Sequence, residues 1–242
     1  MPARDPKNRL IVALDVATLD EAALLLDRLQ GVVGAWKIGS QLFTACGPAA
    51  VELVQKRGGA VFLDLKFHDI PNTVAGAVRE ATRMGVFMLN VHASGGTPML
   101  KAAAEATRQA AREFSVKKPL CLAVTVLTSL DRALLQRELN VPLSVEGQAL
   151  HLATLAKDAG LDGSVCSPQE IRAIRNALGR EWVIVTPGVR PAGSEAGDQA
   201  RVSTPEKAIS AGADYLVVGR PITGAPDPKA AATAILEAMA KA

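Results

Sequence analysis

The feature that most constrains the fold of this chain is an alternation of eight short apolar runs with helix-compatible segments along 242 residues. Each run has the length and the β-branched, apolar character of a buried strand. Strands that alternate with helices form parallel sheets whose faces the helices cover. The predicted strands are Leu10–Val16, Ala35–Ser40, Ala60–Phe67, Phe87–Ala93, Leu120–Leu127, Asp162–Ser167, Trp182–Val189 and Tyr215–Arg220.

The number of these units favours one closed (β/α)8 barrel, with residues 1–242 forming a single catalytic domain. The chain has the length of one such barrel. No long linker, hinge or low-complexity tract divides it. A doubly wound open sheet is the alternative, and it is weakened because no G-x-G-x-x-G follows the first strand.

Chemical markers indicate where several helices begin. The segments Thr18–Glu21 and Ser167–Glu170 match the capping box. Thr97-Pro98, Thr204-Pro205 and Asp227-Pro228 each place a capping side chain before a first-turn proline. We therefore expect a helix to begin at each of these places.

Composition limits the classes of partner. Apolar residues make up 49% of the chain and aromatic residues 3%, and the net charge is +3. The chain has no dense basic run and no aromatic stacking platform, so we expect no nucleic-acid partner, whereas a small anionic substrate stays open. It has no apolar leader and no apolar stretch of about 18 residues, so we expect a soluble cytoplasmic protein that does not bind membranes. Cys46, Cys121 and Cys166 lack metal-site spacing and are expected to be reduced, buried thiols.

Charge inside the third predicted strand, AVFLDLKF, indicates a functional site. Strand alternation places Asp64 and Lys66 on one face, opposite an apolar face, and Asp69 just past the strand end. Buried charges are costly unless they are paired or used. The pattern Asp64-x-Lys66-x-x-Asp69 therefore predicts the core of an active site.

Other polar residues also lie at predicted strand ends, where barrels of this kind carry their active sites. Asp15 ends the first strand, Lys37 lies on the second, His92 ends the fourth, and Thr128-Ser129 end the fifth. We expect Asp15, Lys37, Asp64 and Lys66 to meet at one end of the barrel. The alternative is a buried ion-pair network that only fixes strand register.

The last two strands end in sequences suited to bind an anion. The seventh ends in TPGVR (Thr186–Arg190) and the eighth in VVGRPI, which contains Gly219-Arg220. Glycine allows a phosphate to approach the backbone, and the arginine guanidinium group can donate two hydrogen bonds to the phosphate. The alternative for both arginines is a solvated salt bridge. Two longer connections, Leu127–Ser144 and Val189–Thr204, follow strand ends and are candidate lids.

Several motifs together resemble orotidine 5'-phosphate decarboxylases over essentially the whole chain. The most specific is DLKFHDIPNT, and its order with TPGVRP and VGRPI adds to the match. The matching segments are ALD (Ala13–Asp15), KIG (Lys37–Gly39), DLKFHDIPNT (Asp64–Thr73), LTS (Leu127–Ser129), TPGVRP (Thr186–Pro191), DQAR (Asp198–Arg201) and VGRPI (Val218–Ile222).

The resemblance implies a homodimeric, cofactor-free and metal-free barrel that converts orotidine 5'-monophosphate to UMP in pyrimidine synthesis. By similarity, Lys66 is the proton donor. Lys37, Asp64 and Asp69 complete a charged tetrad with it, and Asp69 reaches the site of the partner subunit.

The resemblance also implies which residues bind the substrate. Asp15 and Lys37 would hold the ribose, and Thr73 would be contributed by the partner chain. The remaining contacts would be to the pyrimidine, from Thr128 and Ser129, and to the phosphate end, from Arg190, Gln199, Gly219 and Arg220.

Three other functions fit parts of the pattern. A magnesium-dependent sugar-phosphate decarboxylase or aldolase would use the carboxylates as metal ligands, and a chelator would stop it. A phosphoribosyl-ligand binding protein without activity would show no turnover. A Schiff-base aldolase acting through Lys66 would be trapped by borohydride.

Overall fold

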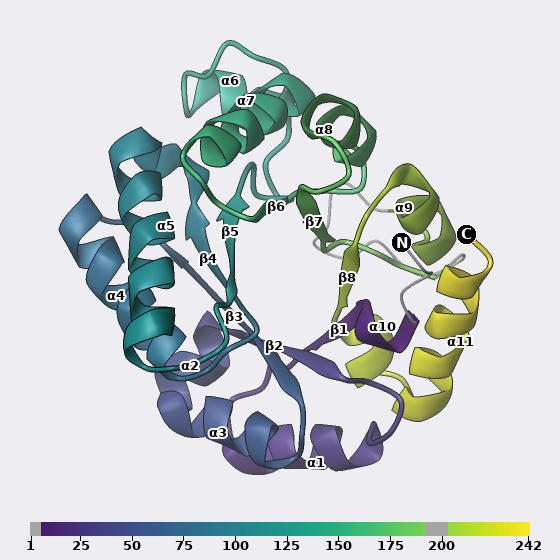
Figure 1. Cartoon of the computed structure of the whole chain (residues 1–242). Helices are drawn as coiled ribbons and strands as arrows, with labels where there is room; N and C mark the ends of the chain where they lie inside the picture. Colours follow the sequence, from purple (N-terminus) through teal and green to yellow (C-terminus); the bar gives the residue numbers. More distant parts are fainter. Residues whose placement is uncertain (1–5, 192–202) are drawn as a thin grey trace.

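The computed structural model describes residues 6–191 and 203–242, and these form a closed barrel of eight parallel strands that pair in chain order. The first strand closes the ring by pairing with the last, Leu10 with Leu216. The view in Figure 1 shows the strands as an inner ring with helices outside it. The barrel prediction is confirmed, and the open-sheet alternative is wrong. The strands are β1 (Leu10–Ala13), β2 (Ala35–Gly39), β3 (Ala60–Phe67), β4 (Met88–His92), β5 (Leu120–Val124), β6 (Gly163–Val165), β7 (Val183–Thr186) and β8 (Tyr215–Val218).

Helices follow the strands and cover the outside of the barrel (Figure 1). Among the described residues no helix is both long and apolar enough to span a bilayer. The α-helices are α1 (Leu19–Arg28), α2 (Ser40–Cys46), α3 (Pro48–Lys56), α4 (Pro71–Arg83), α5 (Gly96–Glu113), α6 (Arg132–Arg137), α7 (Val145–Asp158), α8 (Ile171–Leu178), α9 (Pro205–Ala211), α10 (Arg220–Thr223) and α11 (Pro228–Ala240), and the short 3-10 turns are η1 (Pro6–Asn8) and η2 (Ala93–Gly95).

Three of the predicted helix starts are confirmed. Thr18 forms a complete capping box with Glu21 at the start of α1, and Thr204 and Asp227 cap α9 and α11. Each side-chain oxygen accepts a hydrogen bond from a first-turn backbone N–H that would otherwise have no partner.

Two predicted helix starts are wrong. Helix α5 begins at Gly96, so Thr97 and its proline already lie in the first turn. Ser167 and Glu170 do bond to each other, with 2.7 Å from the Ser167 backbone nitrogen to the Glu170 carboxylate, but they close a turn before α8 begins at Ile171. The same side-chain pair can stabilise an isolated turn.

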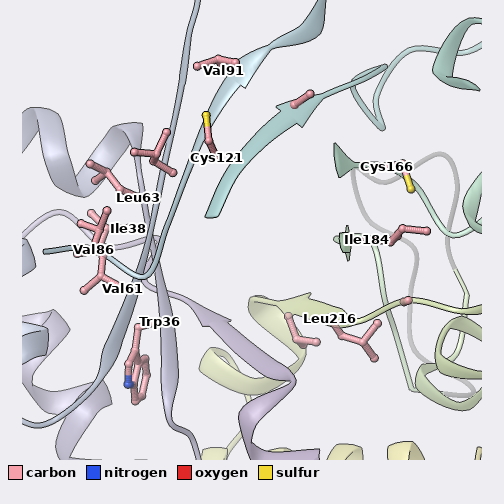
Figure 2. Packing of buried hydrophobic residues seen from close by; sticks show 14 of the residues in the cluster. Trp36, Ile38, Val61, Leu63, Val86, Val91, Cys121, Cys166, Ile184 and Leu216 are labelled. Carbon is pink, nitrogen blue, oxygen red and sulfur yellow. The ribbon is translucent and has the colours of Figure 1, made fainter. Parts of the chain in front are cut away.

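Apolar side chains fill two layers, one inside the barrel and one between the strands and the helices. In β3, Phe62 belongs to the inner layer, while Val61 and Leu63 belong to the outer one. Figure 2 shows the outer layer, where Trp36 and Ile38 of β2 lie beside these two residues. Asp64 and Lys66 line the same cavity as Phe62, which confirms that they continue the inward face. The inner layer consists of Ile11, Ala13, Ala35, Phe62, Met88, Leu122, Val185, Tyr215 and Val217.

The expected burial of the cysteines is found for two of the three. Cys121 and Cys166 are buried, and burial raises the pKa of the Cys121 thiol to about 12. Cys46 is only half-buried, so the expectation of full burial is wrong for this residue. It lies at the end of α2, where the helix meets the surface.

Several strands end earlier than predicted, and the difference bears on the site. Strand β1 ends at Ala13, β5 at Val124 and β8 at Val218. The residues that follow lie in connections above the barrel end. A residue that leaves the ladder is free to turn its side chain over the barrel mouth, which is where functional residues of such barrels lie.

Gly163 of β6 is required by close packing rather than by its backbone angles. A Cβ at this position would lie 2.6 Å from the Cβ of Val183 in β7. We expect Gly163→Ala to lower the free energy of unfolding by about 1–3 kcal/mol, since neighbouring strands would have to separate. Urea unfolding measures this loss.

Gly34 supplies the control for that experiment. A Cβ there would meet no atom closer than 3.8 Å, which is ordinary van der Waals contact. Gly34→Ala should change the free energy of unfolding by less than about 0.5 kcal/mol. Equal losses in the two variants would contradict the packing argument.

Candidate active site

The end of β3 contains a bulge that positions its two inward charges. Leu63 pairs with Leu89 of β4, but the next pair is Phe67 with Val91. Three residues of β3 therefore lie opposite the single residue Asn90. Within the bulge Lys66 has a φ of 52°, in the left-handed region that a lysine rarely adopts. Bulges redirect side chains next to active sites, and backbone strain of this kind concentrates at functional positions.

Four charged side chains, from β2, β3 and the connection after β1, form a row of alternating charge. The Lys66 Nζ lies 2.7 Å from Asp64 Oδ1, and the Lys37 Nζ lies 3.5 Å from Asp64 Oδ2 and 2.9 Å from Asp15 Oδ1. The side chains of Asp64 and Lys37 are only 11% and 13% exposed. Removal of such charges from water is costly, and the opposite charges on both sides of each group offset that cost. The structure thus brings together the four residues that are expected to meet because they lie at predicted strand ends.

Gly39, the last residue of the KIG motif, makes room for this row. A Cβ on Gly39 would lie 2.9 Å from the Lys37 Nζ and 3.6 Å from the Asp15 carboxylate. Any larger residue would therefore push against the Lys37–Asp15 ion pair. The glycine of this motif is explained by the space that the ion pair needs.

A cavity of about 240 Å³ opens above this row at the same end of the barrel. Its walls differ in chemistry. One wall carries the four charged residues. The opposite wall is mostly apolar, and the side near β7 and β8 is cationic. The apolar wall comprises Val124, Val126, Leu127, Val165 and Cys166 with Thr128 beside them, and the cationic side comprises Arg190 and Arg220 with Gly188 and Gly219.

The cationic side places two guanidinium groups near each other. Burial lowers the pKa of Arg190, and the positive charge of Arg220 lowers it further. Two like charges held at one rim favour the binding of an anion between or beside them. The backbone N–H of Arg190 donates to the carbonyl oxygen of Ser203 at 2.9 Å, which fixes the base of this connection.

Some of the predicted site residues do not line this cavity. Asp69, Thr73 and Ser129 are exposed and lie outside the cavity wall. Asp69 accepts a hydrogen bond from the backbone N–H of Ile70 at 2.6 Å. Gln199 and most of the Val189–Thr204 connection, a predicted lid, lie outside the described residues.

Asn90 belongs to the site, although the sequence analysis does not predict it. It is completely buried on β4, donates from Nδ2 to Asp64 Oδ1 at 2.7 Å, and accepts at Oδ1 from the backbone N–H of Lys66 at 2.8 Å. The available signal is a polar residue in the apolar run MLNVH, at a position that shares the inward face with Met88.

The two nearby histidines lie at the edge of the site. The rings of His68 and His92 are 5.4 Å apart. Burial lowers the pKa of His92, and the charges of His68 and Lys66 lower it further. His92 is therefore neutral near pH 7 and adds no positive charge to the site.

The arrangement of donors around the carboxylates bears on metal binding. In residues 6–191 and 203–242, no three histidine, cysteine or acidic side chains gather closely enough to hold a metal ion. One oxygen of Asp64 already faces the Lys66 ammonium and the Asn90 amide, and the other faces Lys37. A divalent cation at this carboxylate would compete with these three donors.

Comparison with known proteins shows close relatives along nearly the whole chain. The model of the family described as "Orotidine 5'-phosphate decarboxylase / HUMPS family" matches residues 8–235. The orotidine 5'-phosphate decarboxylase of Moorella thermoacetica is 60% identical over 229 residues, which are 95% of this chain and 91% of the relative. The enzyme of the same name from Syntrophotalea carbinolica is 53% identical over 238 residues, covering 98% of this chain and 97% of the relative.

Solved structures show the same relationship. The crystal structure of orotidine 5'-phosphate decarboxylase from Lactobacillus acidophilus has a TM-score of 0.83 at 36% identity, covering 96% of this chain and 99% of that one. The family match and the similarity to these relatives extend over the barrel and the cavity at its mouth. The chain therefore belongs to the orotidine 5'-phosphate decarboxylase / HUMPS family.

Proposed function

We propose that this chain decarboxylates orotidine 5'-monophosphate to UMP without a cofactor, as a step of pyrimidine biosynthesis, with Lys66 as the proton donor. The observation that carries the proposal is the Lys66 ammonium, held 2.7 Å from Asp64 at a cavity whose rim carries Arg190 and Arg220. The substrate is the one that the names of the relatives give. Such an enzyme is a carbon–carbon lyase.

In the proposed reaction, the bond between C6 of the pyrimidine and its carboxylate breaks. Carbon dioxide leaves, and the electron pair stays on C6. The Lys66 ammonium stabilises this negative charge and then transfers a proton from Nζ to C6. Water returns a proton to the resulting amine.

The energies of the possible interactions indicate how the activation barrier of decarboxylation would be lowered. A substrate carboxylate about 4 Å from Asp64 would be repelled by roughly 4 kcal/mol at an effective dielectric constant near 20. Enzymatic rate enhancements need about 8–23 kcal/mol. Repulsion alone is therefore too small, and stabilisation of the carbanion by Lys66 together with binding energy from the phosphate must supply most of the effect.

The walls of the cavity suit the parts of the proposed substrate. Gly219 with Arg190 and Arg220 would bind the phosphate, and Asp15 and Lys37 would hold the ribose hydroxyls. The apolar wall on β5 and β6 would cover the pyrimidine ring, with a polar contact from Thr128. Ser129, outside the cavity wall, is expected from the resemblance to join the contacts to the pyrimidine. Gln199, outside the described residues, is expected from the resemblance to join the phosphate contacts.

We infer a homodimer in which Asp69 and Thr73 serve the site of the partner chain. Both residues are exposed in the single chain and lie away from its own cavity. Ile70 between them is 67% exposed, so the proposed dimer would also remove an apolar side chain from water. The tetrad would then be completed by Asp69 from the partner.

Arg220→Ala tests the phosphate contact. A charge-assisted hydrogen bond contributes about 1.5–3 kcal/mol, so kcat/KM for orotidine 5'-monophosphate should fall about 10- to 150-fold. Orotidine, which lacks the phosphate, should lose almost nothing, because it has no group for Arg220 to bind. Steady-state kinetics of both proteins with both substrates measure this. An equal fractional loss on orotidine would show that Arg220 supports the fold or the chemistry instead.

Turnover tests the function itself. Orotidine 5'-monophosphate is added to the purified protein, and the loss of its ultraviolet absorbance is followed. The same protein is given sugar phosphates with Mg²⁺, since the carboxylates could in principle serve a magnesium-dependent reaction. Turnover of the nucleotide supports the proposal, and metal-dependent turnover of a sugar phosphate alone would replace it.

A further inference from the structure

We propose that Asn90 is a positioning residue that holds the backbone of Lys66 and the carboxylate of Asp64 in the geometry for proton transfer. The proposal deepens the function proposed above, because it rests on Lys66 as the proton donor. Asn90 itself is fully buried and does not line the cavity, so it would act through its two neighbours.

The bulge in β3 creates the need for such a residue. Because three residues of β3 lie opposite Asn90 alone, the regular ladder is interrupted there. A backbone N–H inside a protein needs an acceptor. For Lys66 that acceptor is the Asn90 side-chain oxygen, at 2.8 Å, in place of a carbonyl of the neighbouring strand. The side chain thus supports the left-handed backbone from which the ammonium projects.

The second contact of Asn90 fixes the Asp64 carboxylate. Its Nδ2 donates to Asp64 Oδ1, the same oxygen that the Lys66 Nζ approaches at 2.7 Å. The chemistry of the partners settles the orientation of the amide, since a backbone N–H needs an acceptor and a carboxylate needs a donor. Among uncharged side chains of this length, only an amide offers both at once. One side chain therefore couples the direction of the ammonium to that of the carboxylate.

Asn90→Ala is the first test. Displacement of a reacting group by about 1 Å can lower a rate about 100-fold, and we expect a fall of that size in kcat. The affinity for the product UMP should stay within about threefold, because the phosphate and ribose contacts lie on other elements. Steady-state kinetics and UMP titration measure the two effects separately.

Ser164→Ala is the matched control. Ser164 is also fully buried, and it accepts a hydrogen bond from Trp182 Nε1 at 3.0 Å on the helix-facing side of β6. This variant should lose stability as the Asn90 variant does, with kcat unchanged. If Asn90→Ala keeps the wild-type kcat, or if both variants lose kcat alike, the positioning role is wrong.

Asn90→Asp gives a pH signature that a purely structural role would not produce. The introduced carboxyl group keeps the acceptor for Lys66, but it can donate to Asp64 only while protonated. Its pKa is raised by the adjacent carboxylate. The ratio of variant to wild-type kcat should therefore be highest at acidic pH and fall as pH rises through that pKa. A ratio that does not change with pH contradicts the proposal.

Hydrogen exchange of the Lys66 amide separates this proposal from the proposed function. In the wild-type protein the Asn90 oxygen should protect that amide, and in Asn90→Ala its exchange should be at least about tenfold faster. Ser164→Ala should leave it unchanged. Unchanged exchange in Asn90→Ala would overturn the positioning role even in an active enzyme. Absence of wild-type turnover would count against the proposed function alone.

Discussion

Lys66→Ala is expected to lower turnover of orotidine 5'-monophosphate by about 10⁴-fold or more while the barrel stays folded. The variant loses both the proton donor and the positive charge that stabilises the carbanion, and each effect alone is worth about a hundredfold or more. Asp64 keeps its contacts with Asn90 and Lys37, so its charge is not left unpaired. Steady-state kinetics and thermal unfolding measure the two expectations.

Lys118→Ala is the matched control for this variant. Lys118 precedes β5, at the opposite end of the barrel from the cavity, and its Nζ lies 2.6 Å from Asp162. Its loss also breaks a lysine–aspartate pair, and kcat should stay close to the wild-type value. If purified Lys66→Ala turned over at nearly the wild-type rate, Lys66 could not be the proton donor.

Mixing two inactive variants is expected to restore activity. If Asp69 serves the partner's site, a dimer of one Lys66→Ala chain and one Asp69→Ala chain carries both defects in one site and neither in the other. With complete subunit exchange in an equal mixture, about half of the dimers are mixed, so about a quarter of all sites are intact. Turnover before and after exchange measures the recovery.

A second mixture supplies the control for complementation. Lys37 and Lys66 line the same cavity of one chain, with Asp64 between them. A mixture of Lys37→Ala and Lys66→Ala chains should therefore recover nothing, because every site keeps one defect. Recovery in neither mixture, despite demonstrated exchange, would mean that each chain builds its own site.

The sequence predicts the barrel and the facing of its strands well, for a physical reason. Alternation of inward and outward side chains is a local property, so Phe62, Asp64 and Lys66 can be assigned to one face from β3 alone. The end of the barrel at which functional residues lie follows from topology. Asp15, Lys37, Asp64 and Lys66 meet for these two reasons.

The bulge and its partner could not be predicted in this way. A bulge is a property of the register between two strands, and neither AVFLDLKF nor MLNVH specifies that register by itself. Asn90 gains its role only when β4 lies beside the bulge. The helix starts show the same limit, since Ser167 and Glu170 form their bonds in a turn instead of a helix.

The most direct test of the account is decarboxylation in D₂O after the protein has been treated with a metal chelator. The chelator is kept present, and the product is examined by proton NMR. Proton transfer from exchanged Lys66 to a C6 carbanion predicts UMP with one deuterium at C6, formed at the rate seen without chelator. Loss of turnover on chelation, or UMP without deuterium at C6, would contradict cofactor-free protonation by Lys66.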